Sequence, residues 1–209
     1  MTGRTTRLTA DETVEAASRL LHRDGPDAFS MRRLAAELDV NPMTIYLRFE
    51  NKEALLRAVG ERRLRSIQLP AREGSWEEQV LALAHAVRDT VLASGTAAAL
   101  LAGTDHDISL TVVRLTEHGL WLMESAGLHG DEAVQAYRAV FWHAVGSAMA
   151  TSSMLEVGPE STERAIEDLA DDEVPTYRRL RDRFGAIDPT LQFEQSLRWL
   201  VRGIVSESA

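Results

Sequence analysis

One short stretch of the sequence holds polar side chains at a spacing suited to contact with another molecule. Asn41, Thr44 and Arg48 follow at intervals of three and four residues, which places them on one face of a helix. Amide, hydroxyl and guanidinium groups in such a row can hydrogen-bond base edges in a major groove. Tyr46 and Lys52, the only lysine of the chain, add donors suited to phosphate oxygens.

A second polar pair lies in the middle of the chain. Arg114 and His118 are four residues apart, so one helix can present both to the carboxylate, phenol or carbonyl group of a small ligand. Two other interpretations stay open. His118 can be a hydrogen-bonded core histidine, and Arg114 can pair with Glu117.

Enzyme chemistry has little support. The chain has no cysteine, no His-x-x-x-His or His-Glu-x-x-His spacing and no glycine-rich phosphate loop. The acidic and histidine side chains of 105–107 point in different directions before a helix, where Asp107 is better explained as an N-cap. We therefore expect no metal and no cofactor.

The apolar periodicity predicts an all-α fold. Thr9, Ser30 and Asn51 are suited to N-caps, and Pro42 to the first turn of a short helix. No strand pattern of useful length occurs. The expected helices cover about 10–23, 31–38, 42–49, 52–66, 76–91, 97–103, 108–126, 131–155, 174–184 and 190–206.

The charge is divided unevenly. Residues 1–65 carry a net charge of +2 and residues 66–209 one of −11. The segment 69–74, LPAREG, is a linker candidate near this change of sign. We expect a domain at 1–66 and a second at 67–209.

Composition limits the class of protein. With 209 residues, of which 44% are hydrophobic, the chain can bury a substantial core. No apolar run approaches the roughly 18 residues of a membrane helix, and no signal-peptide core is evident, so a cytoplasmic protein is expected. The acidic segment 156–173 carries a net charge of −7, which indicates a solvated, mobile loop or a frayed helix.

Two short helices and a tight turn form a helix-turn-helix pattern at residues 30–49. Apolar contacts are expected to hold the two helices together, with Ile45 and Phe49 facing inward. Its second helix would then present the polar row to DNA. The residues expected to make these apolar contacts are Leu34, Leu38, Val40, Ile45 and Phe49.

Residues 29–56, FSMRRLAAELDVNPMTIYLRFENKEALL, resemble the DNA-binding signature of the TetR family of bacterial transcriptional regulators. Many positions match in order, including Thr-x-Tyr and Asn-Lys-Glu-x-Leu-Leu. The resemblance implies base contacts from Arg32, Asn41, Met43, Thr44 and Arg48. It also implies phosphate contacts from Tyr46 and Lys52, with Ser30 assisting.

Each of these residues has a plainer interpretation. Tyr46 can pack in the ordinary way, Arg48 and Lys52 can be solvated surface charges, and Arg32 can pair with Glu37 or Asp39.

Most of residues 66–206 resemble the regulatory domain of tetracycline repressors, which implies helical effector binding and a homodimer on a palindromic operator. The last helix has a broad apolar face from Leu191 to Val205, which would pair in a dimer or pack on its own chain. The resemblance implies a cavity lined by Val87, Leu101, Thr104, Arg114, His118, Tyr137 and Phe141. Trp121, Trp142 and His143 are expected in the core or the dimer.

Departures from that pattern argue against a tetracycline–magnesium effector. Leu101 stands at the position of the metal-binding histidine, and Ala150 at that of the supporting glutamate. Neither side chain can ligate a hard cation.

Two hypotheses therefore remain. The first is a repressor that a small-molecule effector releases from DNA, with repression taken from the family resemblance alone. The second is an all-helical enzyme or ligand-binding protein with a non-functional DNA-binding unit. A constitutive regulator without an effector is a further possibility, which a closed or filled pocket would favour.

Overall fold

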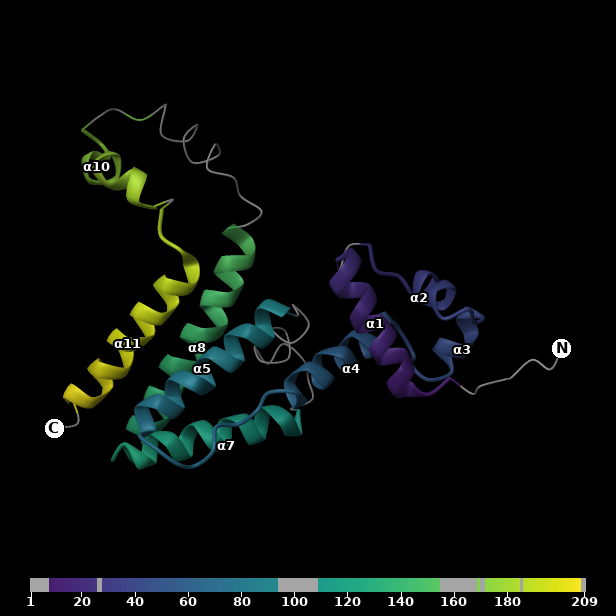
Figure 1. The fold of residues 1–209 in the computed structure, drawn as a ribbon, viewed down its shortest axis with the longest axis horizontal. Helices are drawn as coiled ribbons and strands as arrows, with labels where there is room; N and C mark the ends of the chain where they lie inside the picture. The colour runs from purple at the N-terminus through teal and green to yellow at the C-terminus, as the bar shows by residue number, and fades with distance from the viewer. Residues whose placement is uncertain are drawn as a thin grey trace. The chain divides into compact units, whose positions relative to one another are not determined.

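The computed structural model describes residues 8–25, 28–93, 109–154, 169, 172–184 and 186–207. Every regular element in these ranges is a helix (Figure 1). None of the described helices is long and apolar enough to cross a membrane. The helices are α1 (Ala10–Asp24), α2 (Met31–Glu37), α3 (Pro42–Tyr46), α4 (Lys52–Arg65), α5 (Trp76–Ala93), α7 (Leu110–Ser125), α8 (Asp131–Met154), α10 (Pro175–Phe184) and α11 (Pro189–Glu207).

The helices form two compact units. The first comprises Met1–Gln68 and Ala93–Leu115, and the second Leu69–Leu92 and Thr116–Ala209. Helix α7 therefore contributes its first turns to one unit and the rest of its length to the other. The helix expected at 97–103 and nearly all of the acidic segment 156–173 lie outside the described residues.

The expected N-caps of the first unit are confirmed. The Thr9 hydroxyl accepts a hydrogen bond from the Glu12 amide at 3.1 Å, and the Glu12 carboxylate accepts one from the Thr9 amide at 2.7 Å. Asn51 Oδ1 accepts from the Ala54 amide at 2.7 Å. Each cap satisfies amides that the first turn of a helix leaves without partners, so local sequence fixes where these helices begin.

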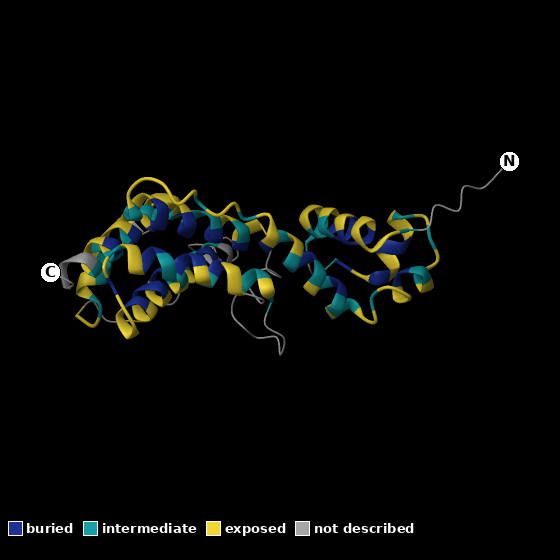
Figure 2. Ribbon diagram, turned by 90° about the horizontal axis from the view of Figure 1, so that it is seen from below, coloured by how far each residue is buried: buried dark blue, intermediate teal, exposed yellow. Residues whose placement is uncertain are grey.

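The core of the first unit joins all four of its N-terminal helices. Leu20, Leu34, Ile45 and Leu55 come from α1, α2, α3 and α4 in turn, and all are fully buried. Phe49 packs against the same cluster. The inward orientation of Ile45 and Phe49 is therefore as the sequence predicts, and Figure 2 shows buried faces turned inward within each unit.

Helix α3 is shorter than expected. It ends at Tyr46, and the amides of Arg48 and Phe49 both bond to the Ile45 carbonyl, at 2.9 and 3.0 Å. The prediction of a helix to residue 49 is therefore wrong, because these bonds close the chain into a turn. Arg48 lies in that turn and remains exposed.

The second unit is built around α8 and α11, which pack against each other and against α5. Phe193 of α11 is 1% exposed and lies between His85 of α5 and His143 of α8. The ring centroids of His143 and Phe193 are 5.4 Å apart and stacked, and the Arg88 guanidinium lies 4.9 Å from the Phe193 centroid. His143 is half-buried and stacks on the buried Phe193 ring at the edge of the core.

Candidate DNA interface and effector site

The exposed residues of the helix-turn-helix come from α3 and the turn that follows it. Met43, Tyr46 and Leu47 are exposed to 63%, 43% and 83%, and Arg48 is also exposed. Thr44 is half-buried. Large side chains this exposed contribute little to the fold, so this face is available to contact another molecule.

Ser30 and Asn41 both act as N-caps. Ser30 Oγ accepts from the Arg33 amide at 3.2 Å and begins α2, while Asn41 Oδ1 accepts from the Met43 amide at 2.9 Å and begins α3. These two side chains therefore position the helices. Each is also exposed at the surface.

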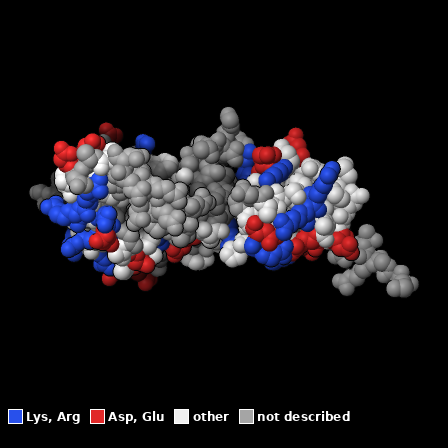
Figure 3. Space-filling model, turned by 90° about the horizontal axis from the view of Figure 1, so that it is seen from above, with Lys and Arg blue, Asp and Glu red and all other residues white. Residues whose placement is uncertain are grey.

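The arginines of the first unit divide into paired and unpaired groups. Arg23 donates to Glu37 at 2.9 Å and Arg33 to Asp24 at 2.7 Å. Glu37 is thus bound by Arg23, and the pairing suggested for Arg32 does not occur. In the described part of the chain, Arg32 and Arg48 make no ion pair. In Figure 3 basic groups lie between acidic ones on the face of this unit that is drawn.

Lys52 ties the start of α4 to the start of α2. Its Nζ donates to the Phe29 carbonyl at 3.1 Å and lies 5.6 Å from the centroid of the Phe29 ring. A lysine ammonium has three donors, so this bond leaves donors for a phosphate. No spacing rule reveals this contact with Phe29, because it joins residues far apart in the chain.

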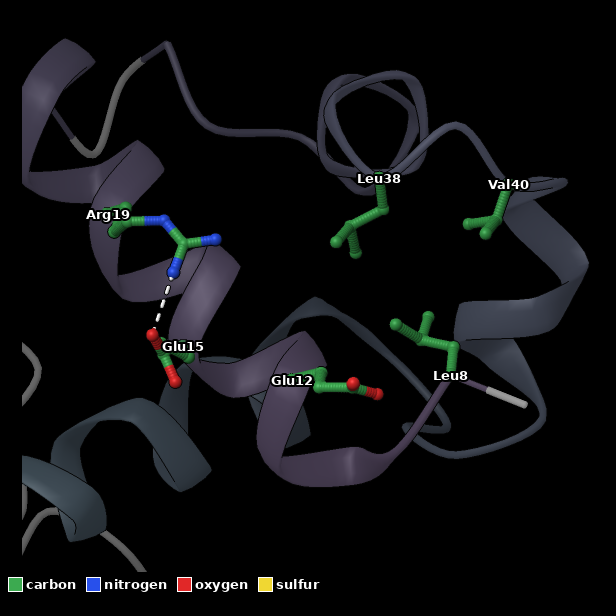
Figure 4. Close-up of a pocket in the computed structure, with 6 residues that line it drawn as sticks. All are labelled: Leu8, Glu12, Glu15, Arg19, Leu38 and Val40. Carbon is green, nitrogen blue, oxygen red and sulfur yellow. Dashed lines mark hydrogen bonds and ion pairs between the residues drawn. The ribbon is translucent and has the colours of Figure 1, made fainter. Parts of the chain in front are cut away.

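A hollow of about 370 Å³ lies between α1 and the residues that follow α2 (Figure 4). Glu12 and Glu15 of α1 face Leu38 and Val40 across it. The two carboxylates disfavour a phosphate backbone. None of the residues predicted to contact DNA lines this hollow.

Two of the predicted effector residues, Tyr137 and Phe141, lie on α8 where this helix contacts α7. The hydroxyl groups of Thr116 and Tyr137 are 3.0 Å apart and hydrogen-bonded. The rings of Tyr137 and Phe141 lie 5.6 Å apart, and His118 lies 5.6 Å from Trp121. Val87 of α5 is buried in the core of the same unit.

His118 is the least satisfied polar residue of this cluster. It is 5% exposed, and its Nε2 has no hydrogen-bond partner among the described residues. Burial lowers the pKa of His118 below its ordinary value, and the positive charge of Arg72 lowers it further. The imidazole is therefore neutral near pH 7, and its free nitrogen can bond to a ligand group.

Arg72, and not Arg114, is the arginine that lies beside Trp121 and acts on His118. Its guanidinium lies 4.4 Å from the Trp121 ring centroid, while Arg114 is exposed and is not brought to the cluster. Arg72 was missed because it lies in the linker candidate. Leu101 and Thr104 lie outside the described residues.

A second hollow, of about 270 Å³, lies between α8 and α11. Its polar lining comes from His143, Ser147 and Thr151 on α8 and from Gln192 and Ser196 on α11. Ala150 also lines it, at the position where the resemblance to tetracycline repressors implies a glutamate. None of the predicted effector residues takes part.

Comparisons with known proteins agree along the whole chain. Residues 14–59 match the family model for bacterial regulatory proteins of the tetR family, and residues 69–207 match that for the tetracyclin repressor-like C-terminal domain. The tetracycline repressor protein class A from transposon 1721 of Escherichia coli is 27% identical over 206 residues, which are 95% of this chain and 91% of that protein.

Two solved structures extend this similarity. The Streptomyces coelicolor TetR family protein ActR in complex with actinorhodin has a TM-score of 0.78 and 26% identity, covering 97% of this chain and 99% of that one. BioQ, known from Mycobacterium smegmatis, has been solved with its double-stranded DNA operator. That structure has a TM-score of 0.63 and 27% identity, covering 95% of this chain and 98% of that one.

The close contact between α7 and α8 yields a prediction about packing. A Cβ at Gly119 would lie 2.4 Å from the Tyr137 ring, so Gly119→Ala should destabilise the second unit by about 1–3 kcal/mol through overpacking. In a Tyr137→Ala background the same change should instead stabilise by up to about 1 kcal/mol, because alanine favours a helix.

Urea unfolding followed by tryptophan fluorescence checks both values, since all four tryptophans lie in the second unit. Equal effects of Gly119→Ala in the two backgrounds would show that the ring does not press on α7.

Proposed function

The chain belongs to the TetR family of bacterial transcriptional regulators, and we propose that it is a homodimeric repressor that leaves a palindromic operator when an apolar, non-tetracycline effector binds. Proteins of this family are ligand-responsive regulators with a helix-turn-helix DNA-binding domain. The observation that carries the proposal is the exposed α3 face in one unit together with the unsatisfied, buried His118 in the other.

The proposed DNA contacts follow from exposure and from pairing. Arg48 and Arg32 are assigned to base edges, with Asn41, Met43 and Thr44 beside them. Tyr46, Lys52 and Ser30 are assigned to the phosphate backbone. The two arginines are supported by their lack of an ion pair in the described residues, because a guanidinium already held by a carboxylate is a weaker candidate.

Operator binding tests this assignment. Arg48→Ala should weaken binding to a selected operator by about 1–3 kcal/mol and relax preference at one base position. Tyr46→Phe should cost about 0.5–1.5 kcal/mol through the lost hydroxyl. Arg19→Ala is the matched control, because Arg19 is an exposed α1 arginine already bound to Glu15 at 2.9 Å.

Fluorescence anisotropy with a labelled duplex provides the measurement. If Arg48→Ala and Tyr46→Phe bind as the wild type does, the repressor proposal fails and the alternative of a ligand-binding protein or enzyme with a non-functional DNA-binding unit is favoured.

The proposed dimer uses apolar groups that the single chain leaves exposed. Leu191 and Trp199 of α11 are each 64% exposed, while Leu197 and Val201 of the same helix are buried within the chain. Trp142 of α8 is 43% exposed. Helix α11 thus has one apolar face for its own core and another that burial against a second copy would cover.

Sedimentation tests the dimer. The wild type should have twice the chain mass of 23.1 kDa, and Trp199→Glu should shift it toward the single chain, because a buried aromatic anchor is replaced by a charge. Val113→Glu, at another exposed apolar residue, should leave the mass unchanged. A wild-type monomer, or equal effects of both variants, would contradict the interface.

The proposed effector carries a phenol or carbonyl group on an apolar skeleton. A neutral His118 can bond to either group, and the Tyr137, Phe141 and Trp121 rings favour an apolar or aromatic body. A carboxylate is disfavoured because a neutral imidazole provides no charge to pair with it. Val87, Thr104 and Leu101 are assigned to the remaining wall. Arg114 is assigned only to the edge of the proposed effector site, because it is exposed.

A release assay tests the effector class. Tetracycline with magnesium should not release the protein from its operator, since Leu101 and Ala150 supply no metal ligand. A compound from a panel of phenols and quinones that does release it should lose potency on His118→Leu, and keep it on the exposed-residue control His129→Leu. Release by tetracycline that a chelator abolishes would contradict this account.

A further inference from the structure

A carboxylate on α4 holds the first turn of α7. Glu61 accepts a hydrogen bond from the Ser109 hydroxyl through one oxygen, and from the Thr111 hydroxyl at 2.5 Å through the other. The Glu61 side chain is only 19% exposed. All three residues belong to the first unit.

Ser109 also caps α7. Its Oγ accepts from the Thr111 amide at 3.1 Å and from the Val112 amide at 3.4 Å, while its own hydrogen goes to Glu61. Ser109 thus takes the capping role that the sequence indicated for Asp107. The negative charge of Glu61 faces the positive end of the α7 dipole, which strengthens the contact.

The ionised state of Glu61 is favoured by its surroundings. Partial burial raises the pKa of Glu61, but the bonds from Ser109 and Thr111 and the charge of Arg65 at 3.3 Å together lower it more. The net direction is down, so the carboxylate is charged at neutral pH and accepts both hydroxyl bonds.

Both helices continue from this contact to groups with proposed roles. Helix α4 begins at Lys52, nine residues before Glu61. Helix α7 carries Thr116 and His118, which follow Thr111 by five and seven residues. A helix rises about 1.5 Å per residue, so each arm is on the order of 10 Å long and stiff. A helix of this length can carry a shift from either end toward the carboxylate.

We propose that Glu61 is a positioning residue that couples occupancy of the effector site to the placement of α4, through its bonds to Ser109 and Thr111. The inference rests on the proposed function, because it needs an operator-binding face and an effector site. It assigns the coupling to one charged contact that can be removed without touching either site.

Coupling between two sites is reciprocal, so DNA can serve as the probe without an identified effector. The probe is an operator duplex selected from a random library by the wild-type protein. Amide hydrogen exchange is measured along residues 112–122 with and without the duplex. The wild type should show a change in exchange on duplex binding that reaches His118.

Two variants remove the contact from opposite sides. Glu61→Ala and the double variant Ser109→Ala/Thr111→Val should still bind the duplex but lose the response along residues 112–122. Glu61→Gln, which keeps the shape and loses the charge, should retain part of the response. Glu117→Gln, an exposed change on α7 itself, should respond as the wild type does.

Each outcome decides the matter. If the wild type binds the duplex and residues 112–122 do not respond, or if both contact-deleting variants respond fully, the coupling role is overturned while the proposed function stands. If one variant fails to fold, the other gives the same comparison. A wild type that binds no selected duplex would overturn the proposed function itself.

Discussion

The burial of Ile45 fixes the position of α3, and every proposed contact with bases depends on that position. Five residues are far too few for a helix to persist alone in water, because nucleation is costly. Burying one isoleucine side chain contributes about 1.5–3 kcal/mol, which anchors the helix from its inner face. Asn41 satisfies an amide at its start. The side chains on the outer face are therefore not needed to hold the helix in place and can serve recognition.

Electrostatic pairing in the first unit determines which basic groups are left for DNA. Arg23 and Arg33 are held by Glu37 and Asp24, contacts that join α1 to α2. Exposed pairs of this kind stabilise little, typically under about 1 kcal/mol. Their larger consequence concerns recognition, because they engage Arg23 and Arg33, whereas Arg32 and Arg48 are exposed and have no ion pair within the described residues.

Sequence reasoning was accurate where structure is local and incomplete where it is not. Capping by Thr9 and Asn51, and the inward direction of Ile45, follow from spacing within a few residues. The Lys52 bond to Phe29 and the Arg72 contact with Trp121 each join distant segments, and no spacing rule reveals them. The same holds for Glu61, whose partners are 48 and 50 residues away.

The overextended α3 and the misplaced Arg114 have a common cause. Apolar periodicity continues through Phe49, but it cannot show that the amides of residues 48 and 49 converge on one carbonyl. Likewise, spacing of four residues puts Arg114 and His118 on adjacent turns, yet only packing decides which of them is buried. The family resemblance implies an effector site, and tertiary contacts supply the reasons for proposing His118 rather than Arg114 as its polar member.

We propose that the exposed face of α3 contacts base edges in the major groove, and base-analogue substitution probes these contacts one atom at a time. Each guanine of a selected operator is replaced by 7-deazaguanine and each thymine by uracil, which removes a single major-groove acceptor or methyl group. We expect weaker binding at a few positions in two symmetric half-sites. The sensitive guanines should be those that an arginine contacts, and the sensitive thymines those that Met43 or Leu47 contacts. Binding unchanged by every such replacement would contradict this proposal.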